Sequence, residues 1–142
     1  MRIPLRRLYT DENGTSHIED VEAELDQGFT VPRSASLFSS PFAEAVNSFW
    51  IGAPAGWAGD EPHPAPRRML LVTVRGEYEI GVGDGVAHRF PPGSVLIMED
   101  TTGEGHTTSV VSAEDLSVFA VGLAPDYDWR QKSNPPAITS TS

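Results

Sequence analysis

The chain has 142 residues, with 20 acidic and 10 basic side chains, four histidines and no cysteine. This length suits a single domain with one hydrophobic core. The net charge of −10 excludes nucleic acid as an expected partner, because neutralising phosphates requires clustered Lys and Arg. The lack of cysteine excludes disulfides, thiol nucleophiles and zinc sites built on thiolates.

The sequence also gives no reason to expect a membrane partner. No apolar run approaches the roughly 20 residues of a membrane-spanning helix. The first seven residues include three arginines, but the polar segment 9–14 follows them where a signal peptide would have an apolar stretch. These features predict a cytoplasmic protein.

The N-terminal part of the chain predicts two strands around a tight turn. The turn spans residues 11–14, and its Asn-Gly pair is a strong hairpin signal because both residues tolerate positive φ. Apolar and acidic side chains alternate over 21–25, which predicts an edge strand with one covered and one solvated face. A helix over 18–25 is the competing interpretation.

The following segments predict little regular structure before residue 68. Segment 26–41 is rich in Ser, Pro and Gly and is predicted to be a loop, and a short helix is expected over 41–45 with Ser40 as its N-cap. A strand is predicted over 46–52. Segment 53–66 contains too much Pro and Gly for a regular element.

The centre of the chain consists of short runs rich in Val, Ile and Leu, separated by Gly, Pro and Asp turns. No helical periodicity competes with this pattern, and evenly spaced short strands indicate a sandwich or barrel. The tail from Ala124 is polar, contains prolines and is expected to fray. The predicted strands are 68–75, 77–82, 95–98, 106–112 and 116–123.

Two central segments carry the pattern of a known family. Segment 62–77 contains an Arg-Gly-Glu hairpin at Gly76, and segment 83–98 places a Pro92-Gly93 turn before an apolar strand. Over about residues 57–123 the chain therefore resembles the cupin superfamily. The resemblance implies an all-β fold: a single jelly-roll-like barrel, a double-stranded β-helix, whose mouth holds a ligand or a metal. We expect one cupin domain over 1–124, with N-terminal strands within 3–25 added as a hairpin at its edge, and a tail over 125–142.

The metal-binding motifs of the family are degenerate in this chain. Counting back from Gly76 places the three ligands of the first motif at His63, Ala65 and Met69, so one histidine remains. Strict counting in the second motif reaches Glu104, whereas a loop two residues longer reaches His106, which we favour because it opens a strand. Two histidines and a thioether suit Fe, Mn and Ni poorly. We expect no cofactor, or a weakly bound divalent metal (Fe, Mn, Zn or Ni) at His63 and His106.

The candidate catalytic residues surround the loop that follows the strand 95–98. The resemblance places His106 on the inward face near the mouth, where it would act as general acid or base. Glu99 and Asp100 are expected to raise each other's pKa at the barrel rim, and an arginine at 67 or 68 would pair with Glu99 or hold a substrate carboxylate or enolate. The competing interpretations are a hydrogen-bonded core histidine and a solvated turn. The expected catalytic set is His106, Glu99, Glu104 and Arg67.

The expected lumen is mostly apolar, which suits an apolar or polyketide-like molecule better than a phosphate or a sugar. The function expected first is a non-oxidative isomerase, cyclase or lyase, resembling in kind the cupins of secondary metabolism. A catalytically silent binding cupin and a metal-dependent cupin oxygenase are the alternatives. A homodimer is expected because the arm 16–25 offers an edge for sheet extension. The expected substrate contacts are Trp57, His63, Met69, Leu71, Thr73 and Thr108.

Overall fold

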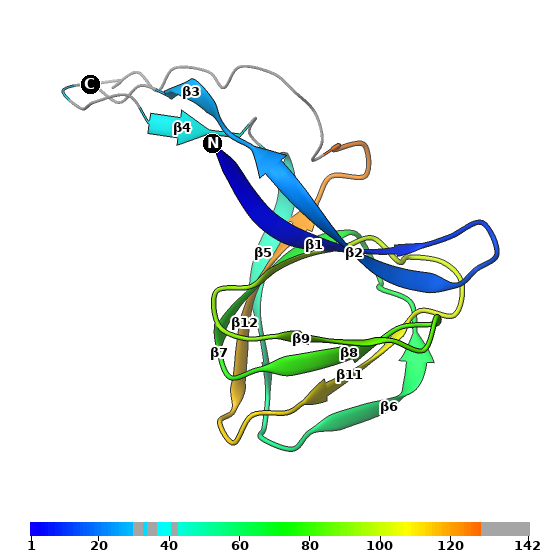
Figure 1. Cartoon of the computed structure of the whole chain (residues 1–142). Helices are drawn as coiled ribbons and strands as arrows, with labels where there is room; N and C mark the ends of the chain where they lie inside the picture. The colour runs from blue at the N-terminus through cyan, green and yellow to red at the C-terminus, as the bar shows by residue number, and fades with distance from the viewer. Residues whose placement is uncertain (30–32, 34–36, 41–42, 129–142) are drawn as a thin grey trace.

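The computed structural model describes residues 1–29, 33, 37–40 and 43–128, and this part of the chain forms strands and no helix (Figure 1). None of its segments is a helix long and apolar enough to cross a membrane. Two larger sheets face each other, and a two-stranded sheet lies at one end of the molecule, next to the N-terminus. The predicted all-β class is confirmed.

The larger sheet has six strands, and the N-terminal hairpin forms one side of it. β1 and β10 run parallel, and every other neighbouring pair in this sheet is antiparallel. The order across the sheet is β2 (Ser16–Glu24), β1 (Arg2–Thr10), β10 (Val95–Met98), β7 (Met69–Arg75), β12 (Leu116–Leu123) and β5 (Ala45–Ala53).

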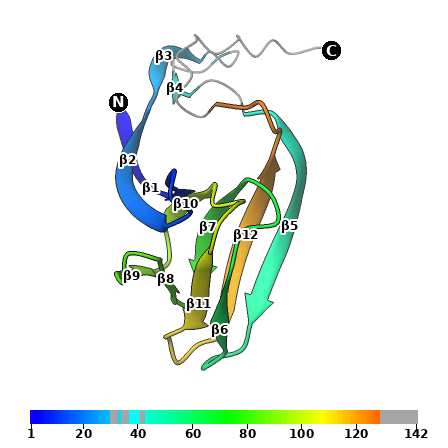
Figure 2. The ribbon, with the colours of Figure 1, turned by 90° about the vertical axis from the view of Figure 1, so that its right-hand side faces the viewer.

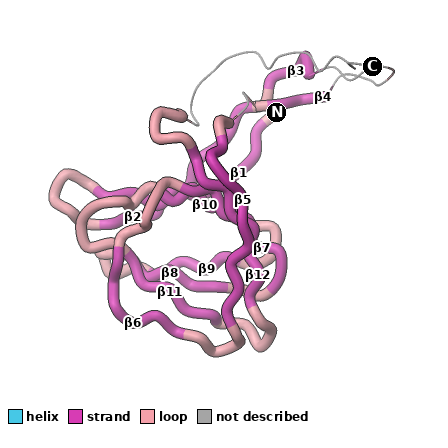
Figure 3. The backbone as a smooth tube through the Cα atoms, turned by 180° about the vertical axis from the view of Figure 1, so that it is seen from behind, coloured by secondary structure: helices cyan, strands magenta, loops and turns pink. Residues whose placement is uncertain are grey.

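The second sheet has four antiparallel strands and faces the β5, β7 and β12 side of the first (Figure 2). Seen from behind, the strands of the two sheets curve around a common centre (Figure 3). The order across this four-stranded sheet is β6 (Ala58–His63), β11 (His106–Val110), β8 (Tyr78–Gly81) and β9 (Ala87–Phe90). The separate two-stranded sheet pairs β3 (Asp26–Phe29) with β4 (Leu37–Ser39).

The core lies between the sheets because the central strands alternate. In β7 the side chains of Met69, Leu71 and Thr73 are buried, and their neighbours along the strand are more exposed. β8 and β12 follow the same two-residue period, which sends every second side chain inward. The turn from β7 to β8 requires Gly76, whose φ is +74° and whose added Cβ would lie 2.8 Å from the Asp115 carbonyl oxygen.

The N-terminal hairpin and the five central strands agree with the sequence prediction. The competing prediction of a helix over 18–25 is wrong, because β2 covers 16–24. The interpretation of 53–66 as irregular is also wrong: β6 forms there because it pairs with β11. The loop predicted over 26–41 contains β3 and β4, and β9 was not predicted at all.

Two predicted segments fall partly or wholly outside the described residues. The helix expected over 41–45 begins at residues that the structure does not describe, and Ala45 already belongs to β5. Of the expected tail, only residues up to 128 are described. The expected edge position of β2 is confirmed, since β2 is the outer strand of the six-stranded sheet; the homodimer built on that edge stays a prediction.

Candidate functional site

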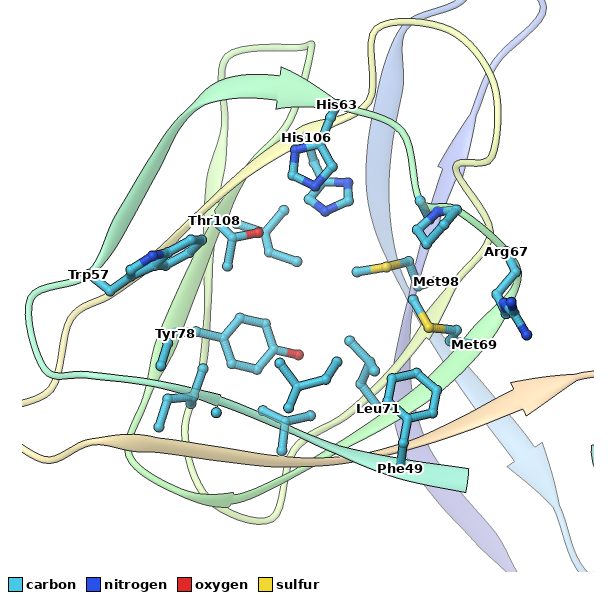
Figure 4. Close-up of a pocket in the computed structure, with 18 of the residues that line it drawn as sticks. Phe49, Trp57, His63, Arg67, Met69, Leu71, Tyr78, Met98, His106 and Thr108 are labelled. Atoms are coloured by element: carbon cyan, nitrogen blue, oxygen red, sulfur yellow. The ribbon is translucent and has the colours of Figure 1, made fainter. Parts of the chain in front are cut away.

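A cavity of about 720 Å³ opens between the two sheets (Figure 4). Its walls come from the inward faces of β5, β7 and β12 on one side and of β6, β8 and β11 on the other. The lining is mostly aliphatic and aromatic, as the alternation of the central strands requires. Its apolar walls include Ile51, Leu71, Ile80, Met98, Leu116 and Val118.

His106 lines this cavity and is held by a buried carboxylate. Its side chain is only 4% exposed, and its Nδ1 lies 2.5 Å from Oδ2 of Asp100, which is fully buried. An ionised carboxylate only accepts hydrogen bonds, so with Asp100 ionised the proton of this pair is on Nδ1. Nε2 is then the ring nitrogen left for the cavity, where it can accept a proton or, once protonated, donate one.

The second histidine reaches the same place from the neighbouring strand. His63 pairs with His106 in the β6–β11 register, and the two ring centroids lie 5.1 Å apart. Gly105 permits this approach: its φ is +77°, and a Cβ there would overlap the backbone carbonyl of His63. His63 itself is exposed, so it lies at the mouth of the cavity while His106 lies inside.

Asp100 is fixed by the backbone as well as by its side chain. Its carbonyl oxygen accepts a 2.9 Å hydrogen bond from the amide of Ala65, which joins the loop after β10 to the segment between β6 and β7. Its second carboxylate oxygen, Oδ1, is buried without a hydrogen-bond partner in the part of the chain that the structure describes. His106 is therefore the side-chain partner around which Asp100 is arranged.

Tyr78 contributes a second polar group to the cavity. The residue is 3% exposed, and its ring stacks on Phe90 with centroids 4.8 Å apart and an interplanar angle of 12°. Burial raises the pKa of the Tyr78 phenol well above its ordinary value, and the neighbouring Thr73 hydroxyl reduces that rise without cancelling it. The phenol oxygen makes no hydrogen bond of standard geometry within the described residues, and Figure 4 shows it directed into the cavity.

The mouth of the cavity carries larger and more polar side chains. Phe49 and Trp57 are 37% and 43% exposed and flank the opening from β5 and from the turn before β6. Arg67, which directly precedes β7, is exposed and also lines the mouth. A ligand entering here would meet aromatic surfaces and one permanent positive charge before it reaches His106.

Glu99 does not take the position expected for a catalytic carboxylate. Its two oxygens bind Arg7 Nε at 2.6 Å and Arg68 Nε at 2.9 Å, and it is not among the residues that line the cavity. The expectation of a raised pKa is wrong for this residue. Partial burial does act to raise the pKa of Glu99, but the hydrogen bonds from both guanidinium groups outweigh it and hold the pKa below its ordinary value.

Two further expected site residues lie elsewhere. Glu104 is exposed in the turn before β11 and does not line the cavity, and its amide donates a 3.2 Å hydrogen bond to the carbonyl of Gly14. Thr73 is buried but does not line the cavity, and its hydroxyl accepts a 3.3 Å hydrogen bond from Ser94. The structure brings the other expected residues to the cavity: His106, Arg67, Trp57, His63, Met69, Leu71 and Thr108.

The residues at this site do not fit the metal set that the cupin resemblance implies. Within the described ranges, no group of three or more His, Cys, Asp or Glu is arranged to hold a metal ion. His63 and His106 supply two imidazoles, and their neighbours in the cavity include the thioethers of Met69 and Met98. Fe, Mn and Ni take oxygen and additional imidazole ligands, whereas the Asp100 carboxylate is hydrogen-bonded to Nδ1 of His106 and is not among the groups that line the cavity.

The sequence places Asp100 at the barrel rim, in a carboxylate cluster near His106, but outside the expected catalytic set, and it does not single out Tyr78. Asp100 was grouped with Glu99 as one of two rim carboxylates, although consecutive residues that continue a strand project to opposite sides. That alternation was the available signal, because Met98 faces inward and Asp100 follows it by two. The same rule places Tyr78 beside Ile80 on the inward face of β8.

No protein-family model matches the chain, and no curated protein sequence matches it either. Solved structures similar to it include a cupin domain of an XRE-family transcriptional regulator from Enterobacter cloacae, at 19% identity over 55% of this chain and 80% of that one, with a TM-score of 0.42. A cupin conserved-barrel protein from Salinispora arenicola is 15% identical over 72% of this chain and 76% of its own (TM-score 0.45). The cupin domain of Cnp3 from Schizosaccharomyces pombe is 15% identical over 87% and 84% (TM-score 0.43).

Each of these three structures is less than 25% identical to the chain. With TM-scores below 0.5 the overlap is partial. The site is therefore defined by the strand pairing and side-chain geometry of this chain.

Proposed function

We propose that this chain, an all-β protein of cupin type, binds a small and mostly apolar molecule between its two sheets and moves a proton on it with His106. The reaction class is non-oxidative: isomerisation, cyclisation or elimination. The single observation that carries the proposal is the buried pair of His106 and Asp100, which presents one imidazole nitrogen to an apolar cavity.

The pair would work through a fixed tautomer. Asp100 accepts the hydrogen bond from Nδ1, so the lone pair of neutral His106 lies on Nε2, on the cavity side. When Nε2 takes a proton from a bound molecule, the buried carboxylate stabilises the imidazolium that forms. His106 can then return that proton at another atom of the same molecule, which is what an isomerase or cyclase requires.

The apolar walls support this chemistry in two ways. They favour a molecule with large apolar surface over a phosphate or a sugar. The same walls bury His106 and Asp100, so that electrostatic interactions with these two residues are stronger than they would be in solvent. Met69, Leu71, Trp57 and Thr108 would contact the molecule, and His63 and Arg67 would contact it at the mouth.

The proposal can be tested without knowing the natural substrate. 2-Tetralone is a small apolar ketone with exchangeable C–H groups next to its carbonyl, and proton NMR in D₂O follows the loss of those signals. We expect saturable exchange catalysed by the wild-type chain, and a loss of about 10²- to 10⁴-fold in His106→Ala, the scale of general acid–base catalysis.

The matched control is His88→Ala, which removes a histidine from β9 that does not line the cavity and should leave the exchange rate unchanged. Equal rates in the wild type and His106→Ala would contradict the catalytic role of His106. If 2-tetralone binds but no exchange is catalysed, the chain is a silent binding protein, which is the second candidate function. Activity that chelators abolish and Fe, Mn or Zn restores would instead favour the oxygenase alternative.

A further inference from the structure

Tyr78 places a buried hydroxyl in a cavity whose surrounding wall is apolar. The residue is 3% exposed, and its oxygen has no hydrogen-bond partner of standard geometry within the described residues. Buried hydroxyls are almost always paired, because leaving one unpaired forfeits its hydrogen bonds to water. The stacked Phe90 ring fixes the phenol plane, so the hydroxyl keeps its direction into the cavity. Such a group is arranged to meet something that enters the cavity.

Tyr78 and His106 lie toward different ends of the same cavity. Tyr78 pairs with Val110 of β11, and Val110 is four residues from His106 along that strand. Positions 106, 108 and 110 share one face of β11, so both groups project to the same side. Four residues of strand span about 13 Å at Cα level, and the side chains shorten the gap between the functional atoms. A single small molecule can therefore contact both groups, with the apolar walls between them.

The charges around the cavity limit what Tyr78 can bind. The cationic side chain on the cavity wall is Arg67, which is exposed at the mouth. Arg6 affects Tyr78 only through its charge: it does not line the cavity, and its guanidinium binds the carbonyl of Arg89 at 2.7 Å. A carboxylate or phosphate beside Tyr78 would thus be buried without a counter-ion, whereas a neutral oxygen acceptor would only need the phenol hydrogen.

Building on the proposed function, we infer that Tyr78 donates a hydrogen bond to a neutral carbonyl oxygen of the bound molecule. The substrate class is then an apolar ketone, ester or lactone that carries its carbonyl toward Tyr78 and its reacting C–H toward His106. Burial keeps the Tyr78 phenol protonated at neutral pH, as a donor must be. This hydrogen bond would give the Tyr78 hydroxyl the partner of standard geometry that the described residues do not provide.

Two dyes that differ in a single acyl group test this inference. 6-Propionyl-2-(dimethylamino)naphthalene has a ketone, and 2-(dimethylamino)naphthalene lacks it; fluorescence titration gives a Kd for each. We expect Tyr78→Phe to weaken ketone binding about five- to tenfold, the net worth of one neutral hydrogen bond, and to change the Kd of the acyl-free dye less than twofold. Tyr9→Phe is the control, since it removes a phenol oxygen outside the cavity and should change neither Kd.

The outcomes separate the inference from the function on which it rests. An unchanged Kd for the ketone in Tyr78→Phe, or equal weakening of both dyes, would overturn the Tyr78 contact while the cavity stands as a binding site. Failure of both dyes to bind the wild-type chain would count against the cavity itself. The melting temperature gives an independent readout: Tyr78→Phe keeps the Phe90 stacking and should not lower it, whereas a lower value would mean that the hydroxyl is satisfied internally by Thr73.

Discussion

Glu99 and Asp100 are adjacent in the sequence and have opposite surroundings. Glu99 binds two guanidinium groups, from Arg7 on β1 and Arg68 before β7, away from the cavity. Asp100 is fully buried and has its side-chain contact with His106. The first carboxylate joins strands of one sheet, and the second orients a ring in the cavity. Two chemically similar residues thus serve structure and site separately, because the end of a strand sends them to different sides.

The contrast between these two carboxylates has a direct consequence for catalysis. Asp100 sets which nitrogen of His106 faces the cavity, so replacing it should change the reaction. Glu99 does not line the cavity, so replacing it should change mainly the stability of the fold.

The largest expected effect in this comparison is that of Asp100→Asn on proton transfer. The amide can donate to Nδ1 and so favour the tautomer with its proton on Nε2, where the base is needed. We expect the rate of 2-tetralone exchange to fall by up to about 10⁴-fold, the loss that follows in a Ser-His-Asp triad when Asn replaces the orienting Asp and the wrong tautomer forms. The measurement is the NMR assay, run beside Glu99→Gln, whose rate should stay within about twofold of the wild type. A larger loss in Glu99→Gln than in Asp100→Asn would reverse the assignment.

The next effect concerns the stability of the fold, for which Glu99 should matter more than Asp100. Glu99→Gln leaves Arg7 and Arg68 without their shared partner, and we expect it to lower the free energy of unfolding by about 1–3 kcal/mol at neutral pH. Because the folded-state pKa of Glu99 lies below its ordinary value of 4.5, this contribution is fully present above that pH and is lost as the pH falls through the folded-state pKa.

Urea unfolding of the wild type and Glu99→Gln across pH 3 to 7 measures this difference. The two free energies should differ most at neutral pH and should converge in acid. A difference that stays constant over the range would show that the ionisation of Glu99 does not contribute to stability.

Much of the fold could be predicted from the sequence, since it depends on local patterns. The alternation of β7 and β12 and the turns at Gly76 and Gly93 mark the central strands. β6 could not be recognised, because its Pro- and Gly-rich residues become a strand only through pairing with β11. β9 escaped notice for a similar reason: its four residues gain their place by pairing with β8.

The site was predictable only in part. His106 was identified because it opens a strand, and Met69, Leu71 and Thr108 because side chains alternate. The partners of the charged residues could not be predicted, since Glu99 meets Arg7 across 92 positions of sequence. Asp100 and Glu99 look alike in sequence, and only the path of the chain after β10 separates them.

The central claim is that Asp100 fixes the proton of His106 on Nδ1, so that Nε2 acts as a base toward an apolar molecule in the cavity. Nitrogen-15 NMR of the His106 ring tests it most directly, before and after addition of 2-tetralone. We predict a proton-bearing Nδ1 and an unprotonated Nε2 in the neutral ring, with the Nε2 resonance moving when the ketone binds. A proton on Nε2 in the neutral ring, or an Nε2 resonance that does not respond to saturating ketone, would contradict the claim.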